Sequence, residues 1–115
     1  MDQPSHAFCS QFHQAIELIG RRWAGAILRA LMSGRARYAD LRNAIPEISD
    51  RMLSERLKEL EGEGIVARFV STEAPLRVEY ELTEKGRDLD KAFQAVAQWA
   101  ETWVPPTEAP EGKTA

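Results

Sequence analysis

Hydrophobic residues recur along this chain with the period of a helix in five stretches, and two further stretches are rich in β-branched and aromatic residues. The pattern therefore predicts five helices and one β-hairpin. The expected helices span residues 12–19, 23–33, 38–45, 50–63 and 84–104, and the expected strands span 65–70 and 77–82. Two short helices joined by a tight turn and followed by a two-stranded ribbon are typical of a winged helix-turn-helix. The expected fold class is mainly α with a small β-hairpin.

The fourth helix, within "ISDRMLSERLKELEGEGIV", has the clearest limits. Ser49 is a good N-cap, because its hydroxyl can accept a backbone N–H of the first turn. Leu53, Leu57 and Leu60 form one apolar stripe, which we expect to be buried. Gly64 ends the helix, in the left-handed conformation that glycine tolerates.

The opposite side of this helix carries Arg51, Ser54, Glu55 and Lys58. A solvated surface helix can show the same charges, so the helix alone does not decide their role. Its place after another short helix and a tight turn favours insertion into the major groove of DNA. Arginine can bind guanine O6 and N7, and glutamate can accept from cytosine N4, so this face can read bases. Arg56 lies nearer the apolar stripe, and we expect it to orient the helix or to contact a phosphate or an acidic neighbour.

Composition adds a constraint on how DNA is bound. The net charge is −3, but residues 21–68 carry ten Lys/Arg against seven Asp/Glu, so the basic excess lies in the middle of the chain. The expected wing adds Arg68 and Arg77. Hydrophobic residues make up 43% and charged residues 29%, which is ordinary for a soluble globular protein. We expect one domain over residues 1–104 and a disordered tail over 105–115, which is rich in Pro, Glu and Gly.

The sequence gives little support for a catalytic, cofactor-binding or metal-binding site. There is no phosphate-binding glycine loop, nucleophile elbow or H-E-x-x-H helix, so we expect no enzyme and no cofactor. Cys9 is the single cysteine and excludes an intramolecular disulfide. Cys9, His6 and His13 together give little support for a metal site, and we expect no bound metal. No apolar run is long enough to span a bilayer and no secretory signal is visible, so a cytoplasmic location is expected.

Three segments carry a family resemblance: "ELIGRRWAGAILRAL", "RYADLRNAIPEISDRMLSERLKELEGEGIVAR" and "RVEYELTEKG". They resemble the HxlR family of bacterial winged helix-turn-helix transcription regulators, which are relatives of the MarR type. The resemblance covers roughly residues 9–99. It implies a dimeric regulator that binds double-stranded DNA, with the fourth helix as recognition helix. Our first hypothesis is therefore sequence-specific binding of a homodimer to a pseudo-palindromic operator, with repression of a nearby gene.

The resemblance also implies roles for particular residues. The residues expected to meet DNA are Ser49, Arg51, Met52, Ser54, Glu55, Arg56, Lys58 and Arg77. Those expected at a dimer interface between terminal helices are Phe12, Phe93, Val96, Trp99 and Trp103. Some family members sense oxidants or electrophiles through a cysteine in the position of Cys9, although Ser10 stands here where the family often has proline. The alternative is a protein-interaction module that kept the fold but does not read DNA. The acidic net charge is the observation that favours this alternative.

Overall fold

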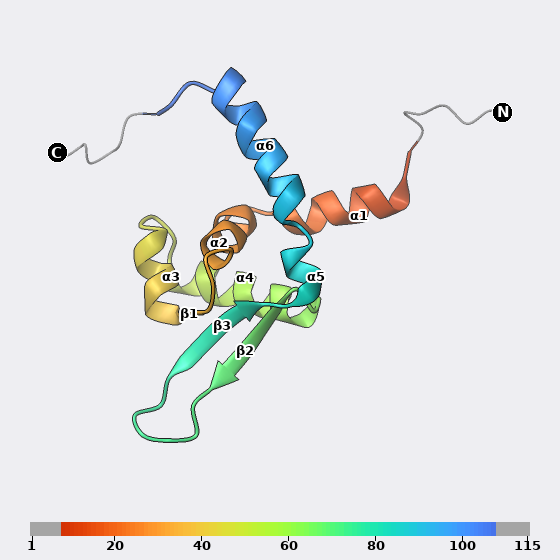
Figure 1. Ribbon diagram of the computed structural model, residues 1–115. Coiled ribbons are helices and arrows are strands. Elements are labelled where there is room, and N and C mark those ends of the chain that lie inside the picture. The colour runs from red at the N-terminus through yellow and green to blue at the C-terminus, as the bar shows by residue number, and fades with distance from the viewer. Residues whose placement is uncertain (1–7, 108–115) are drawn as a thin grey trace.

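The computed structural model describes residues 8–107, within which six helices and three short strands follow one another (Figure 1). In chain order they are α1 (Ser10–Ile19), α2 (Ala24–Leu31), β1 (Ala36–Arg37), α3 (Tyr38–Ala44), α4 (Asp50–Gly62), β2 (Val66–Val70), β3 (Val78–Leu82), α5 (Glu84–Arg87) and α6 (Asp90–Trp103). Helices α3 and α4 with the β2–β3 hairpin form the predicted winged helix-turn-helix, so the predicted fold class is confirmed. Apart from 105–107, the predicted tail lies outside the described residues.

The three strands form one antiparallel sheet in the order β1-β3-β2. In the hairpin, Val66 pairs with Leu82 and Val70 with Val78. β1 runs along the other edge of β3 and places Ala36 opposite Tyr80. The hydrophobic pattern did not predict β1, because a strand of two residues is too short to show any periodicity. Its pairing ties the start of α3 to the wing.

The core lies where α2, α3 and α4 meet the inner face of this sheet. Leu53, Leu57 and Leu60 are all buried, as the apolar stripe of α4 predicts. They pack in one cluster with side chains from the other elements: Ile27, Leu28 and Leu31 of α2, Leu41 of α3, Ile45 and Ile48 of the α3–α4 turn, and Ile65, Val66, Tyr80 and Leu82 of the sheet. Burial on this side leaves the opposite side of α4 to solvent.

The ends of α4 form as predicted. The Ser49 hydroxyl accepts the Met52 backbone N–H at 3.0 Å, which satisfies one of the free donors of the first turn. After the helix, Gly64 has φ +76°, the left-handed conformation in which a side chain would be strained. These two residues fix where the recognition helix begins and where the chain turns into β2.

The last predicted helix is wrong as one continuous element, because the chain breaks between α5 and α6. Thr83 caps α5, and its hydroxyl also donates to the Gly64 carbonyl at 2.6 Å. Gly86 lies so close to β2 that a Cβ built on it would be 2.4 Å from the Ile65 carbonyl oxygen. These contacts hold α5 against the sheet, whereas α6, which begins after Leu89, projects away from the sheet (Figure 1).

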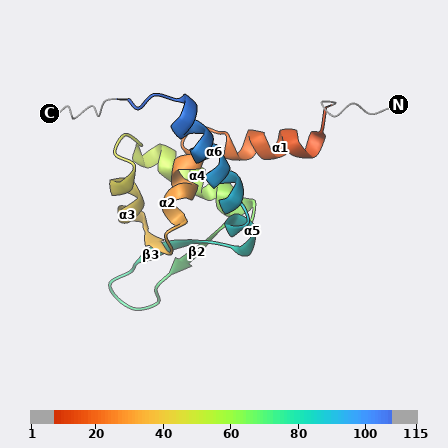
Figure 2. The ribbon, with the colours of Figure 1, turned by 45° about the horizontal axis from the view of Figure 1, so that its top comes forward.

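Helices α1 and α6 project from this core (Figures 1 and 2). Both helices are described in full, and neither contains a buried residue. In Figure 2, α6 crosses in front of the inner end of α1 and lies next to α2. No helix among the described residues is both long enough and apolar enough to cross a membrane.

Candidate nucleic-acid interface

The exposed side of α4 carries the side chains that the sequence pattern selected. Arg51, Ser54, Glu55 and Lys58 are all exposed, opposite the buried leucine stripe. Arg51 extends furthest, with 87% of its side chain accessible, and its Nε donates to Glu55 Oε2 at 3.2 Å. An exposed pair at this spacing contributes only about 0.3–0.5 kcal/mol, so it opens readily when a better partner arrives. The face can therefore offer donors and acceptors to a groove.

Arg56 lies on a different side of the same helix. Its Nε donates to the Arg22 backbone carbonyl at 2.8 Å, and its Nη1 donates to Glu59 Oε2 at 3.2 Å. Only 14% of the side chain is accessible. Of the alternatives expected for Arg56, the structure contains the acidic neighbour, and the guanidinium joins α4 to the turn between α1 and α2. Met52, also expected to meet DNA, is half-buried and packs against the core.

A hydrogen-bond network joins α3 to the first turns of α4. The Tyr38 hydroxyl lies 3.1 Å from the Asp50 backbone carbonyl, 3.3 Å from Asp50 Oδ1 and 3.1 Å from Ser54 Oγ. Arg42 pairs with the same Asp50 carboxylate through its Nη1. The sequence did not predict a role for the Tyr38 hydroxyl, because its partners depend on how α3 and α4 meet. The network fixes Asp50 and Ser54 at the start of the exposed face.

The wing places further cations beside this face. Arg68 is opposite Tyr80 in the hairpin register, so its side chain leaves the sheet on the side of α4. A hollow of about 250 Å³ between α4 and the sheet is lined by Ser54, Lys58, Glu61, Arg68 and Tyr80. An adjoining hollow of about 500 Å³ is lined by Arg37, Tyr38, Ala39, Arg68, Leu76, Arg77, Val78 and Tyr80. Arg37 was not among the predicted site residues, because only β1 brings it to the wing; the "RAR" run was the available signal.

Carboxylates of the wing lie on the other face of the sheet, where arginines bind them. Arg35 donates to Glu79 at 3.5 Å and to Glu81 at 2.9 Å, and Arg87 donates to Glu81 at 3.1 Å. The hydrogen bond from Arg35 lowers the pKa of Glu81, and the same bond raises the pKa of Arg35. The Arg35 guanidinium also lies over the Phe69 ring, 4.0 Å from its centre. The acidic side chains of β3 are thus matched on the side away from α4.

The N-terminal cysteine stands at the start of a helix. Cys9 is exposed and is the N-cap of α1, where its Sγ accepts the Phe12 backbone N–H at 3.4 Å. Among the described residues, no group of three His, Cys, Asp or Glu side chains could hold a metal ion. His6 lies outside the described residues.

The terminal helices expose a large apolar surface. Four of its side chains are between 60% and 69% accessible: Phe12, Val96, Trp99 and Trp103. Phe93, the fifth residue of the expected interface, is half-buried and packs against the core. An apolar hollow of about 450 Å³ adjoins them, lined by Ile19, Gly20, Gly25, Arg29, Phe93, Val96 and Ala97. Large apolar side chains left exposed on two helices without buried residues are typical of interaction surfaces.

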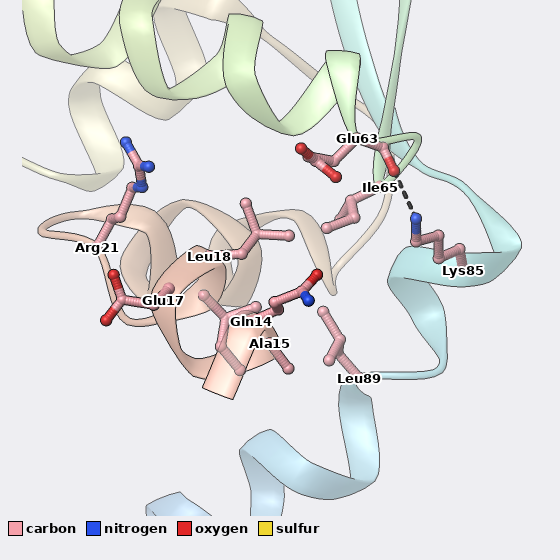
Figure 3. Close-up of a pocket in the computed structure, with 10 residues that line it drawn as sticks. Gln14, Ala15, Glu17, Leu18, Arg21, Glu63, Ile65, Lys85 and Leu89 are labelled. Carbon is pink, nitrogen blue, oxygen red and sulfur yellow. Dashed lines mark hydrogen bonds between the residues drawn. The ribbon is translucent and has the colours of Figure 1, made fainter. Parts of the chain in front are cut away.

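A second hollow of about 450 Å³ lies between α1, α5 and the α4–β2 turn (Figure 3). Leu18, Ile65 and Leu89 form its apolar walls. At its edge, Lys85 Nζ donates to the Glu63 backbone carbonyl at 2.7 Å. This bond ties the C-terminal end of the recognition helix to α5 and so to the base of α6.

An exposed helix of a helix-turn-helix, set beside a wing with free cations, defines a DNA-binding protein of the transcription-regulator class. The HxlR-like helix-turn-helix family model matches residues 18–108. The chain therefore belongs to the HxlR-like helix-turn-helix family, and the resemblance seen in its motifs is confirmed.

Individual relatives are similar over most of their length. The HTH-type transcriptional regulator YvaP of Bacillus subtilis (strain 168) is 41% identical over 99 residues, which cover 86% of this chain and 92% of that protein. YodB of the same strain, also an HTH-type transcriptional regulator, is 44% identical over 101 residues, which cover 88% and 90%.

Solved structures agree with the fold. The reduced form of YodB has a TM-score of 0.77 at 44% identity, covering 88% of this chain and 99% of that one. The redox regulator HypR in its oxidized form has a TM-score of 0.76 at 33% identity, covering 86% and 99%. YodB has also been solved in diamide-treated and quinone-bound forms.

Proposed function

We propose that this transcription regulator binds a pseudo-palindromic operator as a homodimer and represses the adjacent gene, with α4 in the major groove and the wing over the flanking backbone. The observation that carries the proposal is that Ser54 and Lys58 of α4 line one hollow together with Arg68 of the wing, while Arg68 and Arg77 line the adjoining hollow. Two copies related by a two-fold axis place their recognition helices about 34 Å apart, one turn of DNA.

Each side chain of the face has a chemical role in this arrangement. Arg51 donates to guanine O6 and N7, and Glu55, released from Arg51, accepts from cytosine N4. Lys58 and Arg77 contact phosphates, together with Arg68. Ser49 sets the start of the helix by capping it. Met52 and Arg56 act from behind the face, by packing and by the bond to the Arg22 carbonyl.

The apolar surface of α1 and α6 supports the dimer. Phe12, Trp99 and Trp103 lie on two helices that carry no buried residue of their own within the described chain. A second copy presents the same surface, so a two-fold contact buries both at once. Burying them removes a patch that would otherwise promote aggregation.

Titration of the upstream DNA of the gene by fluorescence anisotropy tests DNA reading. Arg51→Ala should weaken binding by about 1–3 kcal/mol and relax preference at one base pair of each half-site. Lys58→Ala should weaken all sequences alike and lower the salt slope of the dimer by roughly two, because one phosphate in each of the two half-sites is no longer neutralised. Lys91→Ala, an exposed lysine on α6, is the control for the removal of a positive charge. Unchanged binding in both α4 variants rules out this face, and a dimer that ignores all DNA at low salt supports the protein-interaction alternative.

A second candidate function is a redox response through Cys9. Its supporting observations are the exposed thiol at the N-cap of α1 and the similarity to regulators solved in reduced, oxidized and diamide-treated forms. With one cysteine in the chain, two Cys9 thiols of different copies form a disulfide by giving two electrons and two protons to an oxidant such as diamide. DNA binding of wild type and Cys9→Ser, with and without diamide, tests this. Equal loss of binding in both proteins removes Cys9 from the response.

A further inference from the structure

The network between α3 and α4 constrains one proton. A tyrosine hydroxyl carries a single hydrogen, and Tyr38 has three oxygen neighbours: the Asp50 carbonyl at 3.1 Å, Asp50 Oδ1 at 3.3 Å and Ser54 Oγ at 3.1 Å. The two Asp50 oxygens can only accept, and one belongs to a carboxylate that Arg42 holds in place. If the Tyr38 proton pointed at Ser54, its lone pairs would face both of these acceptors with no hydrogen between them. The proton therefore goes to Asp50.

This assignment fixes the hydroxyl of Ser54. Because the Tyr38 hydroxyl donates its hydrogen to Asp50, its oxygen can only accept a hydrogen bond from Ser54. The Ser54 O–H therefore points back into the protein. The lone pairs of Ser54 Oγ are then left to solvent, on the exposed face between Arg51 and Lys58. A serine that could otherwise donate or accept behaves here as an acceptor.

We propose that Tyr38 is a positioning residue that makes Ser54 select an amino base, adenine through N6 or cytosine through N4, on the strand that Ser54 faces in the major groove. The inference rests on the proposed DNA reading by α4. Adenine and cytosine present an amino donor in the major groove, whereas guanine and thymine present keto oxygens at the equivalent place. To bond a keto oxygen, Ser54 must first give up its bond to Tyr38, so keto bases are disfavoured at this position.

The experiment is selection of binding sites from a randomised pool of double-stranded DNA, followed by anisotropy on single-site duplexes. Ser54→Ala identifies the base pair that Ser54 reads, because preference disappears there. At that pair, the wild type should bind amino bases about fivefold tighter than keto bases on one strand, the difference expected for one hydrogen bond. Tyr38→Phe should reduce this ratio to under about twofold by tightening binding to keto bases, since the freed Ser54 hydroxyl can now donate.

Other outcomes are equally decisive. A merely structural role of Tyr38 would weaken binding to all four bases alike and leave the ratio at about fivefold, which overturns the inference. A wild-type protein that distinguishes purines from pyrimidines at this base pair, instead of amino from keto bases, would also overturn the inference. This result does not depend on whether any variant folds. Tyr80→Phe removes the hydroxyl of the other tyrosine, which has no hydrogen bond to Ser54 among the described residues, and should keep the wild-type ratio. A wild type that selects no site at all contradicts the proposed function instead.

Discussion

Replacing Arg56 by alanine should destabilise the fold far more than replacing Arg51, although both are arginines of α4. Arg56 loses a charged hydrogen bond to the Arg22 carbonyl, worth about 1.5–3 kcal/mol where the acceptor is left without a partner. Its pair with Glu59 adds only a few tenths of a kcal/mol, because Glu59 is about a third exposed and keeps Arg21 at 3.5 Å. The expected decrease in the free energy of unfolding is therefore about 2–3 kcal/mol for Arg56→Ala. For the exposed Arg51 it is under about 0.5 kcal/mol.

Urea unfolding followed by circular dichroism measures both values, at one protein concentration because a dimer's stability depends on it. Decreases within about 0.5 kcal/mol of each other would refute the role of Arg56 as a link between α4 and the α1–α2 turn. DNA binding, measured at urea concentrations well below the unfolding midpoint, tests whether Arg56 contacts a phosphate. If Arg56 instead contacts a phosphate, Arg56→Ala will lower the salt slope as Lys58→Ala does, while stability changes little.

Three further changes test other parts of the structure. Gly86→Ala places a methyl group against the Ile65 carbonyl and should cost about 1–3 kcal/mol of stability in the same urea titration; an unchanged midpoint would contradict the close packing of α5 on β2. Because the bond from Arg35 lowers the pKa of Glu81 in the folded chain, its contribution is present above the unfolded pKa of about 4.3 and is lost as pH falls through the folded value. Glu81→Gln should therefore flatten the acid limb of a stability–pH curve below that value, and an unaltered limb would exclude this contribution. Trp99→Ser should shift sedimentation towards the monomer while circular dichroism stays helical; an intact dimer would place the interface elsewhere.

The sequence alone predicted the recognition helix well, because its signals are local. An N-cap serine, a leucine stripe and a terminal glycine act within a few residues, and Ser49 and Gly64 take the conformations that such residues favour. The break between α5 and α6 was not predictable in this way. Leu89 and Phe93 keep the helical spacing on the α6 side of the break, so the pattern gives no local sign of it. The contact of Gly86 with Ile65, which holds α5 against the sheet, is made between distant segments.

The same difference between local signals and contacts of distant segments applies to the candidate site. Exposure of Arg51 and Lys58 followed from the wheel of a single helix, so periodicity was enough to find them. The Arg22 carbonyl that Arg56 binds lies in the α1–α2 turn, and the oxygens that Tyr38 contacts lie on α4. Spacing along the chain carries no information about how these segments meet. Resemblance to a family placed Arg56 with the DNA-binding residues, but only the packing of α4 against the α1–α2 turn reveals its link to the Arg22 carbonyl.

An acidic net charge of −3 is compatible with DNA binding here because several carboxylates of β3 and α4 are paired with arginines of the protein itself. Arg35 and Arg87 bind the glutamates of β3 on the far face of the sheet, and Arg42 binds the aspartate at the start of α4. Within the described chain, Lys58, Arg68 and Arg77 have no carboxylate within 4.0 Å, and they border the hollows beside α4. A phosphate approaching this side therefore meets cations that need not first break an ion pair. The local placement of charge, more than the total, decides whether the surface attracts DNA.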